Sequence, residues 1–193
     1  PVKGFSLRPP LGTTCSRIAS ANRLVMWTMR KSPKAPILWR LSVYSRIDEQ
    51  HKPGENLAAY GKKLGARLAK AEGFKAPAPR IIELPGAKAI NLRGETSGKI
   101  KFWQRRAWIH LQSRTFLEVR ISGPTSDREK LDAIASAVLK TLKIIDLKTA
   151  KAQRKTALVN GTALLKGLNA KKISGTLEAK PQWFLYHRDG QPI

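Results

Sequence analysis

Acidic residues, cysteine and long hydrophobic runs are all scarce in this chain of 193 residues. Only 13 Asp and Glu stand against 37 Lys and Arg, which gives a formal charge of +24, and the first 47 residues contain no acid. The single cysteine, Cys15, excludes an intrachain disulfide and a zinc site built on several thiolates. No apolar run reaches the length of a transmembrane helix. A net charge of this size and sign attracts nucleic acid, an anionic membrane surface or an acidic protein, and it does not show which of the three is the partner.

No catalytic or metal-binding motif is recognisable in the sequence. The three histidines, His51, His110 and His187, lie far apart along the chain. A zinc site needs three or four ligands, and a nucleophile needs a base within hydrogen-bond reach. We therefore interpret His110, on a strand beside Trp108, as a packed or half-exposed imidazole, and Cys15 as an incidental cysteine. We expect a protein that is not an enzyme and that needs no cofactor.

Hydrophobic periodicity outlines the elements of the first half of the chain. The apolar segment 5–11 predicts a short edge strand. Apolar and polar residues alternate over 37–47, which predicts a half-buried strand that forms a hairpin with 24–30. Over 55–72 the apolar residues recur at intervals of three and four, so we expect an amphipathic helix with a basic outer face that ends at Gly73.

Residues 99–122 predict a β-hairpin folded about 113–115. The register that gathers the aliphatic residues on one face places Leu111 opposite Leu117, Ile109 opposite Val119 and Ala107 opposite Ile121. The other face is too aromatic to lie wholly in water, so we expect a helix or loop to cover part of it. In this arrangement truncation of the inward Leu117 should cost much more stability than truncation of the outward Glu118.

The order of these elements defines a fold class. Short strands at 80–84 and 88–93 precede the hairpin, and a capping box at 126–129 opens a helix that ends near Lys143. Strands, helix, strands and helix in succession predict an α+β fold, an antiparallel sheet with helices packed on it. We expect 1–147 to form this domain. Residues 148–193 predict a basic helix plus a strand that begin a second unit continuing beyond the chain.

Four segments also follow a known pattern of order and spacing. They are the opening Gly4–Pro10, the turn Leu84–Ala89, the hairpin Trp103–Ile121 and the closing helix Leu131–Leu142. In these features the first 147 residues resemble the PsbP-like fold. The resemblance implies an α/β/α sandwich that serves as a binding or assembly module, mostly without catalysis. It also favours an extracytoplasmic location, as in bacterial secreted or lipid-anchored relatives, and it assigns no functional residue.

One basic cluster is interleaved with aromatic residues and is our predicted binding site for an anionic partner. Its members are Lys99, Lys101, Phe102, Trp103, Arg105 and Arg106. Cations beside aromatic rings are typical of single-stranded nucleic-acid sites. In the alternative interpretation Trp103 belongs to the core and the cations form a solvated edge. If they form an exposed site, replacing its four cations by Gln should leave the melting temperature nearly unchanged.

Taken together, these observations predict a non-enzymatic docking domain that engages an acidic protein or an anionic surface. The alternative is a nucleic-acid-binding protein, such as an RNA-particle subunit or a protein that binds single-stranded DNA or RNA. No RNP, KH, zinc-finger or helix-turn-helix signature accompanies the basic clusters. Salt dependence separates the two classes only partly because salt screens both attractions, whereas a copurifying partner would separate them well.

Overall fold

The computed structural model describes residues 3–16, 22–97, 101–146 and 182–184, and it confirms the α+β fold. The larger sheet contains β2 (Thr14–Ser16), β3 (Arg23–Arg30), β4 (Ile37–Ile47), β5 (Phe74–Lys75), β6 (Arg80–Leu84), β7 (Ala87–Thr96), β8 (Phe102–Gln112) and β9 (Thr115–Pro124). Its strand order is β2-β3-β4-β9-β8-β7-β5, and β6 also pairs with β7. All of these pairings are antiparallel.

A smaller sheet lies beside the first and is built around the N-terminal strand. In it β1 (Lys3–Leu7) pairs with β10 (Lys143–Asp146) on one side and with β11 (Gln182–Phe184) on the other. The prediction of an edge strand at 5–11 is therefore wrong, since β1 is the central strand and ends at Leu7. Most of 148–193 lies outside the described residues, and the boundary at residue 147 stays a prediction.

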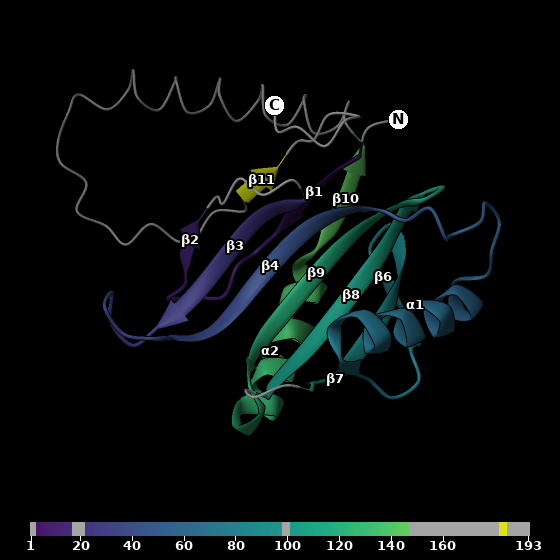
Figure 1. Cartoon of the computed structure of the whole chain (residues 1–193). Helices are drawn as coiled ribbons and strands as arrows, with labels where there is room; N and C mark the ends of the chain where they lie inside the picture. The colour runs from purple at the N-terminus through teal and green to yellow at the C-terminus, as the bar shows by residue number, and fades with distance from the viewer. Residues whose placement is uncertain (1–2, 17–21, 98–100, 147–181, 185–193) are drawn as a thin grey trace, which may run out of the picture.

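Two helices pack on opposite faces of the larger sheet (Figure 1). Helix α1 (Leu57–Glu72) begins where the Asn56 side chain accepts hydrogen bonds from two backbone N–H groups, and it ends at Gly73 in the left-handed conformation, as predicted. Helix α2 (Arg128–Thr141) follows a 3-10 turn, η1 (Thr125–Asp127). The predicted capping box does not form because Ser126 lies inside η1 and Asp127, which precedes the helix, makes no side-chain cap.

The two faces bury separate hydrophobic cores. On one face α1 covers the aromatic side of the hairpin, where Tyr60, Leu64, Phe74, Trp108 and Phe116 pack together, so the predicted cover is confirmed. On the other face α2 and β1 enclose the larger core, which contains the aliphatic side of the hairpin. The α1 helix contacts mainly β5, β6 and β7, and its Tyr60 stacks on Phe116 near the start of β9, while β3, β4 and the far end of β9 are not covered by this helix.

The hairpin register differs from the predicted one by two residues. Ile109 pairs with Leu117, and Ala107 pairs with Val119. The chain reverses over a two-residue turn at Ser113, whose φ is positive at 43°, and a β-bulge lies between His110 and Gln112. A shift of two keeps every side chain on its predicted face, because side chains alternate with a period of two.

Candidate anion-binding site

The six residues predicted to bind an anionic partner do not form one exposed edge. Strand β8 lies inside the sheet between β7 and β9, and its side chains alternate between the two faces. Lys101 is exposed and the Phe102 side chain is 40% exposed, whereas Trp103 is only 3% exposed and belongs to the larger core. Lys99 lies outside the described residues.

Arg105 is a buried structural cation on the α2 face. Its guanidinium donates hydrogen bonds to Asn91 Oδ1 at 2.9 Å, to Asp132 Oδ1 at 3.1 Å and to Ser136 Oγ at 2.5 Å. Burial lowers the pKa of Arg105, and the neighbouring Arg93 lowers it further, while Asp132 opposes both effects. These contacts join α2 to the sheet, so Arg105 is not available to a partner.

Arg106 is fully buried on the α1 face. It donates to Glu72 Oε2 at 2.5 Å and lies 3.8 Å from Glu118 Oε1, and its guanidinium stacks over the Phe74 ring at 4.6 Å. A fully buried cation is stable only when it is paired in this way. The prediction that Arg105 and Arg106 belong to an exposed site is therefore wrong, and we expect their neutralisation to reduce stability.

Glu118 is the centre of the ionic network to which Arg106 belongs. Although this side chain is fully buried, its Oε2 accepts from Arg46 Nε at 2.8 Å and its Oε1 from Arg120 Nε at 2.8 Å. Burial alone would raise the pKa of Glu72, but its bonds with Arg106 outweigh that effect and hold the pKa below the usual range. Three arginines thus surround two glutamates, and the network keeps one positive charge in excess.

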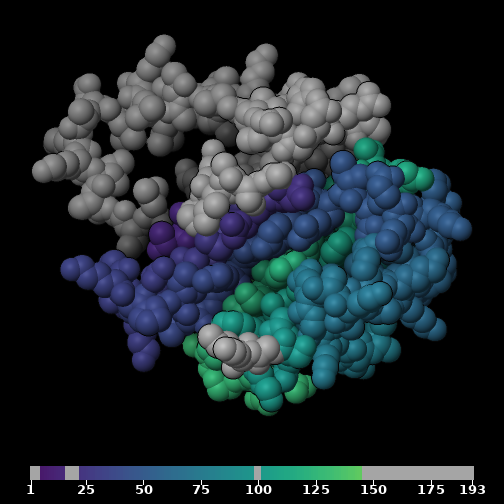
Figure 2. Space-filling model, viewed as in Figure 1, coloured from purple at the N-terminus to yellow at the C-terminus, as the bar shows by residue number. Residues whose placement is uncertain are grey.

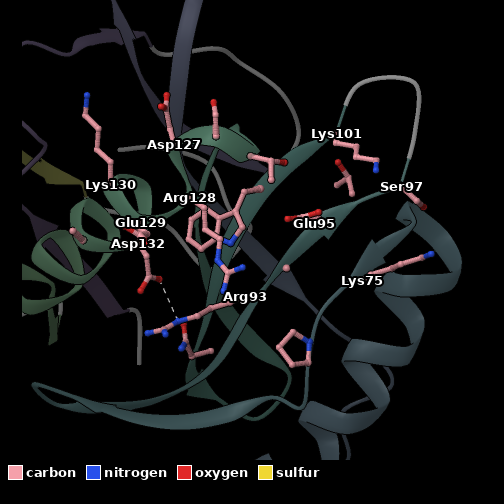
Figure 3. Close-up of a pocket in the computed structure, with 18 of the residues that line it drawn as sticks. Lys75, Arg93, Glu95, Ser97, Lys101, Asp127, Arg128, Glu129, Lys130 and Asp132 are labelled. Atoms are coloured by element: carbon pink, nitrogen blue, oxygen red, sulfur yellow. Dashed lines mark ion pairs between the residues drawn. The ribbon is translucent and has the colours of Figure 1, made fainter.

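A large open cleft of about 1510 Å³ lies on the α2 face (Figure 3). We call it the α2 cleft. The start of α2 lines one side, and Lys75, Glu95 and Lys101 lie on the other. Its cations are mixed with carboxylates, and Arg93 Nε forms an ion pair with Asp132 Oδ1 at 3.2 Å. The described lining holds six cations, Lys75, Arg80, Arg93, Lys101, Arg128 and Lys130, and four acids, Glu95, Asp127, Glu129 and Asp132.

A second hollow lies on the opposite face, on the part of the sheet that α1 leaves open. Figure 2 shows this face, with β9 visible as a strip between β4 and α1. The hollow has a volume of about 470 Å³, and we call it the arginine groove. Its cations are all arginines, Arg23, Arg30, Arg40 and Arg120, and no acid occurs among the described residues that line it.

Three arginines of the groove have no carboxylate partner in the described part of the chain. Arg40 is exposed and stands between Thr28 and Ser122 on neighbouring strands. Arg30 donates through one nitrogen to the Ala35 carbonyl at 2.5 Å, and Arg23 donates through one terminal nitrogen to Met26 Sδ at 3.5 Å. These guanidinium groups therefore retain donors for an external anion.

The ends of the groove carry aromatic rings. Phe102, which among the described residues of the predicted site is the one that lines this groove, pairs with Pro124 across β8 and β9. Tyr44 pairs with Glu118 across β4 and β9. The guanidinium carbons of Arg46 and Arg120 lie 4.7 and 4.9 Å from the centroid of its ring. Arginines and aromatic rings therefore do come together, but from β3, β4, β8 and β9 rather than along one stretch of β8.

Comparisons with known proteins identify the fold. No family model and no curated protein matches the sequence. Among solved structures, LpqN of Mycobacterium tuberculosis, which is involved in cell envelope biogenesis, superposes with a TM-score of 0.55 at 15% identity, covering 75% of this chain and 84% of that one. Cyanobacterial PsbP from Synechocystis gives 0.54 at 12% identity, covering 73% and 86%. The fold is PsbP-like.

A third PsbP-like neighbour is a putative regulator of unknown function from Pseudomonas aeruginosa, PA94, with a TM-score of 0.50, 14% identity and coverage of 67% of this chain and 94% of that one. Identities this low establish the fold alone. None of the three neighbours is described as an enzyme. Within the described residues of this PsbP-like domain, no helix is long and apolar enough to cross a membrane.

Two of the three histidines meet in this PsbP-like domain, beneath the hairpin turn. The rings of His51 and His110 lie 5.1 Å apart, and Nδ1 of His51 and Nε2 of His110 lie 2.7 and 3.0 Å from the Ser113 carbonyl oxygen. Asp48 next to them accepts bonds from Tyr60 and Arg67. Burial would raise the pKa of Asp48, yet these bonds lower it. The cluster is packed against Phe116 and fixes the turn to α1.

Proposed function

We propose that this PsbP-like domain is a non-catalytic binding module whose arginine groove docks an anionic partner. The observation that supports this most strongly is the charge of the groove, where four arginines line a hollow without an acid among its described residues. Guanidinium groups bind carboxylates and phosphates through two parallel hydrogen bonds. An acidic protein or an anionic surface is therefore a partner of fitting chemistry.

A nucleic acid is the second candidate partner. It is supported by a specific observation, the exposed Phe102 and the Tyr44 ring at the groove, because aromatic side chains bind bases by stacking. Both candidates use the same cations, and both would respond to salt.

The lining of the groove supports a role in binding rather than in catalysis. The hydroxyl groups of Ser42 and Ser122 have no His, Cys, Asp or Glu beside them among the described groove residues, and a hydroxyl nucleophile needs such a base. An extracytoplasmic location forms part of the proposal. It is supported by the fold shared with LpqN, which is a protein of cell envelope biogenesis.

The test compares two triple variants of the full chain. Arg23, Arg30 and Arg40 are replaced together by Gln, and the matched control replaces the exposed Lys62, Lys70 and Lys140. Affinity for heparin is measured at several salt concentrations. Each phosphate-like contact that is lost should reduce the slope of log affinity against log salt by about 0.7–0.9. We expect a reduction of about two to three for the groove variant and a much smaller one for the control. Equal losses would mean diffuse attraction and no site.

A further inference from the structure

We infer that the anionic partner of the arginine groove is a single-stranded nucleic acid. This inference rests on the proposed function of the groove and adds the chemical class of the partner. It follows from the balance of hydrogen-bond donors and acceptors in the groove, from the placement of its rings and from the arginine planes that rest against Tyr44.

The groove offers many donors and few acceptors. Its floor is formed by interior strands, so the backbone N–H and C=O groups of β4 and β9 are already used in the sheet ladders. Arg120 already donates to Glu118, Arg30 to the Ala35 carbonyl and Arg23 to Met26 Sδ, so what remains are the other N–H donors of these arginines and those of the exposed Arg40. An extended acidic peptide brings backbone N–H groups that would find few acceptors here. A phosphodiester backbone carries only acceptors, which this groove satisfies.

The rings of the groove suit bases that are not paired in a duplex. Phe102 pairs with Pro124 and Tyr44 pairs with Glu118. These two partners are six residues apart on β9, which separates the backbone positions of the two aromatic residues by about 20 Å at the rise of a strand. Phe102 is 40% exposed although it is a large hydrophobic residue. Bases in a duplex are stacked on one another inside the helix, whereas those of a single strand can stack on aromatic side chains.

Two arginine planes lie against one of the two rings, Tyr44. Glu118 holds Arg46 and Arg120 by hydrogen bonds of 2.8 Å, and both guanidinium groups rest against Tyr44. Because these side chains are already fixed, little conformational entropy is lost when a ligand contacts them. Arginine planes also stack on bases, while Arg40 remains exposed to contact a phosphate.

The experiment separates base stacking from charge. Fluorescence anisotropy compares an oligothymidylate of about 15 nucleotides with an abasic phosphodiester chain of the same length and charge, using the full-length protein. The wild type should bind the oligothymidylate about five- to a hundred-fold more tightly, which corresponds to one stacked base. Phe102→Ala should remove most of that preference and leave binding of the abasic chain unchanged. Phe102→Leu, which keeps an apolar side chain without a ring, should behave like Phe102→Ala.

Two further probes distinguish failure of this inference from failure of the proposed function. If poly-glutamate or anionic phosphatidylglycerol vesicles bind as tightly as the oligothymidylate and Phe102→Ala changes nothing, while the triple arginine variant weakens all three, the nucleic-acid inference is overturned and the docking groove stands. If the triple arginine variant binds every probe as the wild type does, the groove itself is refuted. A base preference that is lost in both Phe102 variants supports the inference.

Discussion

The two hollows of this domain differ in how their cations are compensated. The described lining of the α2 cleft combines six cations with four acids, and Arg93 there is paired with Asp132. The described lining of the arginine groove has four cations and no acid. The larger hollow is thus largely neutralised by its own residues, whereas in the smaller one only Arg120 has a carboxylate partner, Glu118, and the other three arginines have none in the described part of the chain.

This contrast shows that the number of basic residues does not locate a binding site. Arg105 and Arg106 belong to the binding site predicted from the sequence, yet they form buried ion pairs with Asp132 and Glu72. Arg40 lies outside the basic cluster that the sequence singled out. It remains exposed and has no ion pair in the described part of the chain. Paired cations should therefore matter for stability, and unpaired cations should matter for binding.

The largest expected effect is at the centre of the paired network. Glu118→Gln leaves Arg46, Arg106 and Arg120 with Glu72 as their only acid in the network, and breaking a buried ion pair costs about 3–5 kcal/mol. Urea unfolding of the variant measures this cost. This expectation reverses the one from sequence, in which Glu118 lay on the outward face and its truncation would cost little if it were exposed, because Glu118 is fully buried.

Leu117→Ala, one residue away on the opposite face, provides the comparison. Leu117 is 3% exposed in the larger core, and its truncation should cost about 2–5 kcal/mol. We therefore expect two neighbouring residues on opposite faces to have similar costs for different reasons. A cost below about 1 kcal/mol for Glu118→Gln would show that the carboxylate is hydrated and the network loose.

A medium effect is expected for Arg105 when it is compared with Arg93. Both contact the Asp132 carboxylate, but the Arg105 side chain is 6% exposed and that of Arg93 is 44% exposed. Arg105→Gln should cost about 2–3 kcal/mol because buried charged hydrogen bonds are lost. Arg93→Gln should cost at most about 1 kcal/mol, as is usual for exposed pairs. Equal costs in thermal or urea unfolding would refute the assignment of Arg105 as a structural cation.

The sequence was informative where a pattern is local. The period of 55–72 and the left-handed Gly73 delimit α1, and the alternation of the hairpin assigns its faces correctly. The register was missed because it depends on the positive φ of Ser113 and on a bulge. The fate of Arg105 and Arg106 was missed because their acids, Asp132 and Glu72, lie 27 and 34 residues away along the chain.

The pH dependence of stability tests another paired cation, Arg67, through its carboxylate partner Asp48. The pKa of Asp48 is held below its ordinary value by Arg67 and Tyr60, against the opposing effect of burial. A lowered folded pKa contributes stability that is complete above the unfolded value of about 3.9 and is lost as the pH falls through the folded value. Unfolding free energy should thus be flat near neutrality and fall below about pH 4. Asp48→Asn should be less stable at pH 7 and show a shallower acid decline, and an unchanged decline would exclude Asp48 as its source.

The smallest expected effect on stability is that of the unpaired cations. Replacing Arg23, Arg30 and Arg40 together by Gln removes no described ion pair, so it should change the unfolding free energy by well under about 1 kcal/mol. The mutual repulsion of like charges in one groove even favours a small gain. Calorimetry of this variant beside Arg105→Gln measures the contrast directly. If the triple variant melts well below the wild type, these arginines hold the fold together, and the distinction between paired and unpaired cations that identifies the groove is lost. If it melts with the wild type and no longer binds polyanions, stability and binding are carried by different arginines of the same sheet.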